Sequence, residues 1–267
     1  MKKTYNFGTL FMPVTLPTIY TSITEGVKNR KKKLALLIDP DKFKSTTALT
    51  NGIEAGVDYI FVGGSILTKG SLQRCVETIK KTTDIPLVLF PGSPDQIDPH
   101  ADGILFLSLI SGRNPDNLIG KHVLSAPVLK KTSLEIIPTG YLLIDGGSST
   151  SAAYMSNTMP IPYGKSDIAA CTALAGEMLG LKLIYLDTGS GALKPVSEKM
   201  IREVKKNINI PLIIGGGIKN AENAYDLCIA GADMLVIGTV AEQSPELISE
   251  IVSAVHQSSK YIATAKD

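Results

Sequence analysis

Eight short apolar runs, spread over almost the whole chain, constrain the fold more than any other feature. They are rich in Val, Ile and Leu, and they show little alternation of apolar and polar residues. Strands that are apolar on both faces are typical of a parallel sheet covered by helices. The predicted strands cover residues 34–39, 59–64, 87–91, 103–109, 136–144, 182–187, 211–215 and 234–238.

Helix-like segments separate most of these strands, so the order is strand then helix, repeated. The predicted helices cover 44–55, 69–82, 115–130, 165–180, 196–207, 219–230 and 244–258, and an extra helix is expected within 13–33. The length, 267 residues, is close to that of one such barrel. The sequence therefore predicts an α/β fold, a modified (β/α)8 TIM barrel with an N-terminal extra helix, in a single domain over residues 1–267.

The composition excludes several classes of protein. The net charge is only +2, so no nucleic-acid partner is expected. No run reaches the roughly 18 apolar residues of a membrane span, and the first residues lack the apolar core of a signal peptide. Cys75, Cys171 and Cys228 are widely spaced, so we expect reduced thiols in a cytoplasmic protein. We interpret the basic run 28–33 as a solvated helix end, with transient contact to an anionic membrane surface as the alternative.

Glycine-rich turns follow the last three predicted strands. They are Asp187–Gly191, Gly215–Gly217 and Gly238–Thr239. Backbone N–H groups exposed in such turns bind anions, and the last loops of a (β/α)8 barrel are where phosphate sites cluster. Gly189 and Gly191 allow positive φ or close backbone approach. The pattern predicts a phosphate site, with the Thr239 hydroxyl as an additional donor.

Acidic residues end two of the predicted strands, on the face where barrel enzymes keep their active sites. Asp39 ends the first strand and is a suitable Mg²⁺ ligand, with the Ser65 hydroxyl as a second candidate. Asp187 and Tyr185, two residues apart, should face the same way; Asp187 is a candidate base or polyol acceptor, with a structural carboxylate as the alternative. Asp41 is interpreted as the N-cap of a helix that begins near Phe43.

An internal repeat marks the opposite face. The segments AGVDYIFVGG (55–64) and AGADMLVIGT (230–239) share Ala-Gly-x-Asp before a strand. Gly56 and Gly231 fit helix C-caps, where a left-handed residue is needed. Asp58 and Asp233 then lie where their strands begin, and we expect them to serve turns and stability.

One connection, residues 145–164, is unusually long for a strand-to-helix loop. Its apolar residues are Tyr154, Met155, Met159, Ile161 and Tyr163. We expect a lid or wall for an apolar ligand; packing against a neighbouring helix remains open.

Six segments together resemble the geranylgeranylglyceryl phosphate synthase and heptaprenylglyceryl phosphate synthase family. They are LIDPDKF (37–43), YIFVGGS (59–65), LFPGS (89–93), YLDTGSGA (185–192), IIGGGI (213–218) and VIGT (236–239). The resemblance implies a Mg²⁺-dependent prenyltransferase that moves a long prenyl group, geranylgeranyl being the expected one, from its diphosphate to the 3-hydroxyl of sn-glycerol 1-phosphate. The product would be an ether lipid precursor. Because members of this family form oligomers, the resemblance also implies a homo-oligomer.

The resemblance also carries over site residues. It implies that Asp39 and Ser65 bind the metal and that Asp39 and Asp187 are the catalytic residues. The implied glycerol-phosphate site comprises Tyr185, Leu186, Asp187, Thr188, Gly189, Ser190, Gly191, Gly216, Gly217, Gly238 and Thr239. One position departs from the family, because YLE is the commoner motif and this chain has YLD. The shorter side chain retracts the carboxylate by one methylene.

Two other interpretations fit part of the pattern. The glycine turns alone suit any phosphate-binding barrel, such as an isomerase or lyase acting on a sugar phosphate. A barrel that only binds a lipid phosphate would not need acids at two strand ends. Asp39 on the first strand and the apolar loop favour prenyl transfer over both.

Overall fold

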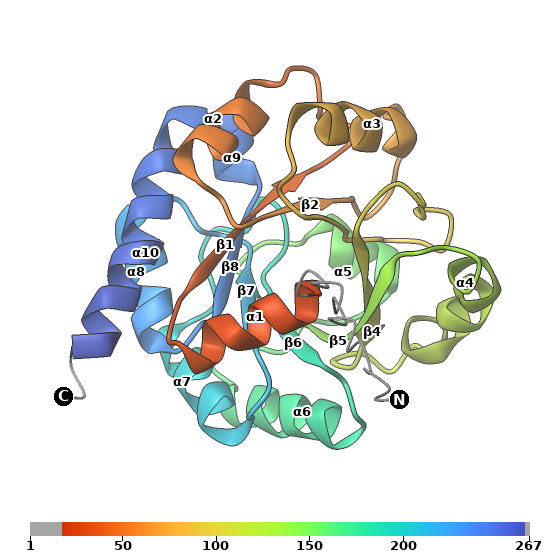
Figure 1. Cartoon of the computed structure of the whole chain (residues 1–267). Coiled ribbons are helices and arrows are strands. Elements are labelled where there is room, and N and C mark those ends of the chain that lie inside the picture. Colours follow the sequence, from red (N-terminus) through yellow and green to blue (C-terminus); the bar gives the residue numbers. More distant parts are fainter. Residues whose placement is uncertain (1–17, 265–267) are drawn as a thin grey trace, which may run out of the picture.

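The computed structural model describes residues 18–264, and these form a closed barrel of eight parallel strands in chain order, β1 to β8. Figure 1 shows the strands as a central ring with the long helices outside it. The predicted (β/α)8 fold is therefore confirmed. The strands are β1 Lys33–Ile38, β2 Tyr59–Val62, β3 Leu87–Leu89, β4 Gly103–Leu109, β5 Glu135–Leu143, β6 Leu183–Asp187, β7 Leu212–Gly215 and β8 Met234–Ile237.

The long helices follow the strands as predicted, and no helix joins β3 to β4. That missing helix leaves residues 90–102 as an irregular segment along one side of the barrel mouth. The helices that flank the ring are α2 Thr47–Ala55, α3 Leu72–Thr82, α4 Lys121–Leu129, α6 Ser166–Met178, α7 Glu198–Asn207, α8 Ala221–Ala230 and α10 Ile248–Thr264. A one-turn π-helix, Asp116–Gly120, leads into α4, and a short 3-10 helix, Pro245–Leu247, leads into α10.

Three further helices differ from the predicted pattern. The extra helix α1 spans Ile19–Lys28, shorter than the range 13–33; residues 13–17 lie outside the described part of the chain. The sequence pattern did not predict α5, Ser151–Ser156, or α9, Thr239–Gln243. Each is short, so neither contains enough turns to show a helical period.

Helix α1 closes the N-terminal end of the barrel, where Figure 1 shows it lying across the ring. Its Ile19 and Ile23 join the apolar cluster inside the barrel, beside Tyr59 and Phe61. The Glu135 carboxylate accepts hydrogen bonds from the N–H groups of Ile19 and Tyr20, at 2.6 and 3.0 Å. A negative charge at a helix N-terminus is stabilising, so this contact fixes α1 over the opening. The other end of the barrel is left for a site.

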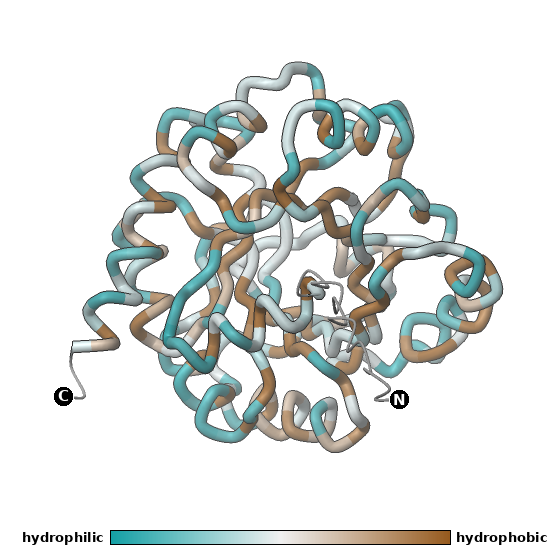
Figure 2. The backbone as a smooth tube through the Cα atoms, in the orientation of Figure 1, coloured by the Kyte–Doolittle hydropathy of each residue, from teal (hydrophilic) through white to brown (hydrophobic). Residues whose placement is uncertain are grey.

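Two apolar layers hold this architecture together. One lies inside the ring, and the larger one lies between the strands and the surrounding helices. Figure 2 shows apolar segments along the strands and polar segments on the outer helices and loops. Because both faces of each strand are buried, the runs show no alternation, as the sequence predicts. The cysteines are free; Cys75 and Cys228 are buried in α3 and α8, and burial raises the pKa of both thiols to about 12.

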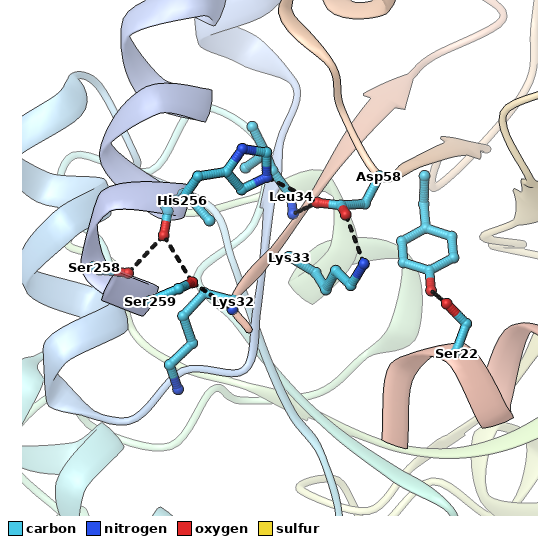
Figure 3. Close-up of polar contacts among 10 residues, drawn as sticks. Ser22, Lys32, Lys33, Leu34, Asp58, His256, Ser258 and Ser259 are labelled. Carbon is cyan, nitrogen blue, oxygen red and sulfur yellow. Dashed lines mark hydrogen bonds and ion pairs between the residues drawn. The ribbon is translucent and has the colours of Figure 1, made fainter. Parts of the chain in front are cut away.

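The repeated Asp58 and Asp233 are structural residues of the N-terminal face, as predicted. Asp58 accepts hydrogen bonds from the Leu34 N–H at 2.9 Å and from Lys33 Nζ at 2.8 Å (Figure 3). Asp233 accepts from the Leu212 N–H at 2.9 Å and from Lys205 Nζ at 2.6 Å. Each aspartate precedes its own strand and binds the first residues of the strand before it in sequence. The two copies of the repeat therefore fasten neighbouring strands.

The interpretation of the basic run 28–33 as a solvated helix end is wrong for its last two residues, Lys32 and Lys33. Lys32 is buried, and its Nζ lies 3.4 Å from Asp233. Lys33 pairs with Asp58, whereas Lys28, Arg30 and Lys31 are exposed. The strand begins inside the run, so its last two lysines become partners of the buried acids.

Candidate active site

One cavity opens at the C-terminal ends of the strands and brings together most of the predicted site residues. Its volume is about 520 Å³, within the range of small-molecule sites. Its wall combines polar groups from the β1, β2, β6, β7 and β8 ends with an apolar side. The predicted residues that line it are Asp39, Ser65, Tyr185, Asp187, Gly189, Ser190, Gly216, Gly217, Gly238 and Thr239.

The glycine turns after β6 and β7 have the backbone conformation that their sequence predicts. Gly189, Gly216 and Gly217 have φ of +85°, +81° and +66°, a region that L side chains avoid. A Cβ on Gly216 would stand 2.7 Å from the N of Gly189, and one on Gly217 would stand 2.4 Å from the carbonyl carbon of Lys194. The turns therefore pack backbone against backbone, which only glycine allows here.

Several backbone N–H groups in these turns, on residues that line the cavity, have no backbone partner in the described part of the chain. Within residues 18–264, the N–H groups of Ser190, Gly216, Gly217 and Thr239 donate to no backbone acceptor. Thr239 is also the first residue of α9, and its hydroxyl lies 3.2 Å from that of Ser190. Backbone N–H groups gathered this way, with two hydroxyls among them, suit the oxygens of a phosphate.

Three predicted residues of the β6 segment lie outside the cavity wall. The Leu186 side chain packs in the layer between strands and helices. Thr188 is buried, and its N–H donates to the Gly215 carbonyl at 3.1 Å. Gly191 has a φ of +77° and no atom within 4 Å of a built Cβ. Alternation along β6 accounts for Leu186 and Thr188, which point outward, whereas Tyr185 and Asp187 point inward.

Asp187 lies at the bottom of the cavity, with only 7% of its surface exposed. It accepts hydrogen bonds from the Tyr141 hydroxyl at 2.5 Å and from the Gly189 N–H at 2.7 Å. Burial raises the pKa of Asp187, and the two hydrogen bonds only partly offset that rise. A buried carboxyl with a raised pKa and cavity access suits proton transfer.

Aromatic rings form the floor beside Asp187, and the sequence analysis did not select two of them. Phe90 stacks on Tyr185 with ring centroids 5.2 Å apart, and Tyr141 meets Tyr185 edge-on at 5.5 Å. Burial raises the pKa of Tyr141 and Tyr185 well above the usual value, so both stay protonated. Tyr141 lies mid-run in β5, where nothing local marks an inward-facing residue as functional.

Asp39 faces the cavity from the end of β1. Its Oδ1 accepts the Asp41 N–H at 3.0 Å, and its Oδ2 lies 3.6 Å from Lys42 Nζ. Gly64 lies close by, because a Cβ there would stand 3.1 Å from Asp39 Oδ1. The Lys42 ammonium also pairs with Glu242 at 3.2 Å, so this lysine connects the β1 end to α9.

The Asp39 carboxylate and the Ser65 hydroxyl fit a Mg²⁺ ion that is completed by a substrate. The described residues contain no group of three or more His, Cys, Asp or Glu that would enclose a metal. Mg²⁺ commonly takes one or two protein carboxylates and fills its remaining positions with water and phosphate oxygens. Asp39 is partly exposed and lines the cavity. The donor set matches a substrate-bound ion, not a protein cage.

The interpretation of Asp41 as a helix N-cap is wrong. Helix α2 begins later, at Thr47. Asp41 instead accepts hydrogen bonds from the N–H groups of Thr68, Lys69 and Gly70, the last at 2.6 Å. Those backbone hydrogen bonds hold the Asp41 pKa well below its usual range. The side chain thus fixes the β2–α3 connection.

The long connection 145–164 contributes a wall to the cavity, and only some of its apolar residues face it. Helix α5 lies within it, and Ala152 and Met155 of that helix line the cavity. Tyr154 and Met159 are 83% and 86% exposed and do not. Further apolar wall residues come from β4, from α4 and from the chain that follows β3, and include Phe90, Ile97, Phe106, Leu109 and Leu129.

Comparison with known proteins agrees with the motifs. The PcrB family matches residues 27–256. The chain belongs to this family. It is 52% identical over 241 residues to a geranylgeranylglyceryl phosphate synthase of Chitinophaga pinensis, covering 89% of this chain and 96% of that one. It is 49% identical to the enzyme of the same name from Spirosoma linguale, covering 88% and 96%.

A solved structure agrees as well. The (S)-3-O-geranylgeranylglyceryl phosphate synthase of Thermoplasma acidophilum, in complex with sn-glycerol-1-phosphate, superimposes with a TM-score of 0.84 at 33% identity. The match covers 91% of this chain and all of that one. The resemblance predicted from the six motifs is therefore confirmed for this PcrB family member.

Proposed function

We propose that this PcrB family protein transfers a long prenyl group from its diphosphate to the 3-hydroxyl of sn-glycerol 1-phosphate. The observation that carries the proposal is one cavity with three chemically distinct parts. Glycine turns offer N–H donors, Asp39 and Ser65 offer oxygen ligands, and an apolar wall extends from them. A sugar-phosphate isomerase or lyase would need the first part but has no use for the last. The relatives' names support the same reaction.

The glycine turns would hold the acceptor substrate. The phosphate of sn-glycerol 1-phosphate binds to the free N–H groups of Gly216, Gly217 and Thr239, and the complex of the Thermoplasma acidophilum relative supports that substrate. The Asp187 carboxylate then accepts a hydrogen bond from the 3-hydroxyl and takes its proton, since burial raises the pKa of this carboxyl. A phosphate anchor a few atoms away keeps that hydroxyl at attack distance.

Asp39 and Ser65 would hold Mg²⁺ against the diphosphate of the donor substrate. The ion neutralises charge on the leaving diphosphate when it is bound. Asp39 has the free lone pairs for this role because its other contacts are one N–H and a lysine at 3.6 Å. The site therefore separates its two phosphorylated substrates, with the acceptor under the β6–β8 turns and the donor at the β1–β2 ends.

The prenyl tail would lie along the apolar wall formed by β4, α4 and α5. Each buried methylene contributes about 0.8 kcal/mol, so a tail of about 15 carbons beyond the reacting unit gains several kcal/mol. Phe106, Leu129 and Met155 are among the residues that line this wall. The names of the relatives favour geranylgeranyl as the group that is transferred.

One assay tests the proposal directly. Purified protein is incubated with Mg²⁺, labelled sn-glycerol 1-phosphate and geranylgeranyl diphosphate, and the organic extract is analysed for a prenyl ether. Product that depends on both substrates and disappears with EDTA supports the transferase. Absence of labelled ether, with Mg²⁺ present and the protein folded, contradicts it.

We also propose that the protein is a cytoplasmic homo-oligomer that meets its lipid substrate at the membrane surface. None of the helices described is long and apolar enough to cross a membrane. Large apolar side chains are exposed along α4 and α6, including Val123, Leu124, Ile168 and Met178. An exposed apolar face of this kind favours a second copy as its partner. Sedimentation of wild type and Leu124→Lys tests the assembly.

A further inference from the structure

Lys121 is a cation in the cavity wall that the motifs did not select. It is the first residue of α4, directly after the π-helix Asp116–Gly120, a kind of irregularity that is frequent at functional sites. Its side chain is half-buried, and its Nζ lies 3.5 Å from the Gly92 carbonyl oxygen, a long contact for a hydrogen bond. No carboxylate among residues 18–264 lies within ion-pair distance of it.

The other lysine of the cavity wall is already neutralised. Lys42 Nζ lies between two carboxylates, 3.2 Å from Glu242 and 3.6 Å from Asp39. A half-buried ammonium without a carboxylate partner loses part of its hydration, and one long contact with a carbonyl oxygen offsets little of that loss. Lys121 is therefore the lysine of the cavity wall that still lacks an anionic partner among the described residues.

The position of Lys121 indicates which anion. Gly92, which its ammonium approaches, packs directly on the β2 end, since a Cβ on Gly92 would stand 2.8 Å from the Ser65 carbonyl oxygen. Gln96, which is 1% exposed, fastens the two loops: its Nε2 donates to the Gly64 carbonyl at 3.0 Å and its Oε1 accepts the Gly92 N–H at 3.1 Å. The ammonium is thus held on the same side of the cavity as Ser65.

We propose that Lys121 binds the diphosphate of the prenyl donor and stabilises it as it leaves. The inference rests on the proposed transferase function and adds a residue to its donor site. When the bond between the prenyl C1 and the diphosphate oxygen breaks, its electron pair passes to the diphosphate. The acceptor's 3-oxygen then bonds to C1 and loses its proton. The Lys121 ammonium donates hydrogen bonds to the oxygens that gain negative charge, as the preorganised donors of other active sites do.

Substitutions separate a binding role from a general effect of charge. Lys121→Met removes the ammonium and keeps most of the length of the unbranched side chain, whereas Lys121→Arg keeps a cation. Lys130→Met is the matched control, because Lys130 is an exposed lysine at the other end of the same helix. We expect Lys121→Met to lower kcat/KM for geranylgeranyl diphosphate about 100-fold at saturating glycerol phosphate. The KM for glycerol phosphate should stay within about twofold, and Lys121→Arg should restore part of the loss.

A second readout measures binding of the leaving group alone. Inorganic pyrophosphate should inhibit wild type and Lys130→Met equally, and it should inhibit Lys121→Met about tenfold less well. Equal inhibition of all three, or equal changes in the KM of both substrates, would overturn the assignment. These results are interpretable only if wild type makes the prenyl ether. Failure of the proposed function would therefore appear as an inactive wild type, and failure of this inference as an active wild type with unchanged Lys121→Met.

Discussion

The two ends of the barrel use the same kind of side chain for opposite purposes. At the N-terminal end, Asp58, Asp102 and Asp233 each accept a backbone N–H of a neighbouring strand and a lysine ammonium. At the C-terminal end, Asp39 and Asp187 have two partners each, and both line the cavity. The first group fastens strands to one another and does not line the cavity. The second lies where a ligand in the cavity can reach it.

The position of an acid relative to its strand decides which group it joins. Asp58, Asp102 and Asp233 come just before β2, β4 and β8. Their carboxylates turn back to the N–H of Leu34, Leu87 and Leu212, each near the start of the preceding strand. An acid that ends a strand has no such neighbour, because the parallel strands end at the cavity. Location at a strand end is thus more informative than residue type.

Removing the carboxylate of Asp39 should produce the largest change in activity. Asp39→Asn keeps the size of the side chain but weakens the proposed Mg²⁺ ligand. We expect turnover to fall about a thousandfold, because several kcal/mol of charge stabilisation are lost at the leaving group. The midpoint of urea unfolding should change little. Near-normal turnover at limiting Mg²⁺ would remove Asp39 from the metal site and break the contrast between the two ends.

Removing the carboxylate of Asp233 should have the converse effect. Asp233→Asn leaves the ammonium groups of Lys32 and Lys205 without their counter-charge, and Lys32 is buried. Breaking a buried pair in this way costs about 3 kcal/mol of unfolding free energy. Urea unfolding measures that loss, and kcat measured below the unfolding transition should equal that of wild type. A stable Asp233→Asn with reduced kcat would mean that the N-terminal face contributes to catalysis.

The sequence predicts the barrel well, for a physical reason. Two-sided burial of each strand makes the runs continuously apolar, and the strand-to-helix order repeats often enough to be unambiguous. Predicted strand ends were less accurate. The second run was assigned to 59–64, whereas β2 ends at Val62; only the Gly63 N–H still donates to β1, at the Ile38 carbonyl, before the chain departs from the sheet. The hydropathy of the side chains gives no sign of where the chain leaves the sheet.

The candidate site could be predicted from sequence only in part. The acids and glycines at strand ends carry a local signal, and the structure brings Asp39, Asp187 and Gly216 to one cavity. Tyr141 and Lys121 carry no such local signal, because only the way the strands pair in the closed barrel places them at the cavity. Asp41 shows the opposite failure: its local pattern suggests a helix cap, and distant N–H groups of the β2–α3 loop bind it instead.

The phosphate site should respond more weakly to loss of one side chain, because backbone groups build most of it. Thr239→Val removes a hydroxyl and keeps the shape of the side chain. We expect the KM for glycerol phosphate to rise about tenfold, the equivalent of one hydrogen bond to a charged group. The KM for prenyl diphosphate serves as the control and should not change. A thousandfold effect would mean that side chains, not the backbone turns, hold the phosphate.

The smallest expected effect is a pH dependence of stability at the N-terminal face. Burial opposes ionisation of Asp58, but the hydrogen bonds from His256, Lys33 and the Leu34 N–H outweigh it, so the pKa of Asp58 is lowered on folding (Figure 3). A lowered carboxyl pKa stabilises the fold above the ordinary pKa of aspartate, and this contribution is lost as the pH falls through the folded value. Asp58→Asn should therefore cost about 1 kcal/mol at pH 7 and less in acid. Urea unfolding at several pH values measures the difference, with the exposed Asp84→Asn as control. An equal cost at every pH would show that the Asp58 charge adds nothing beyond its hydrogen bonds, and the two ends of the barrel would then differ in geometry alone.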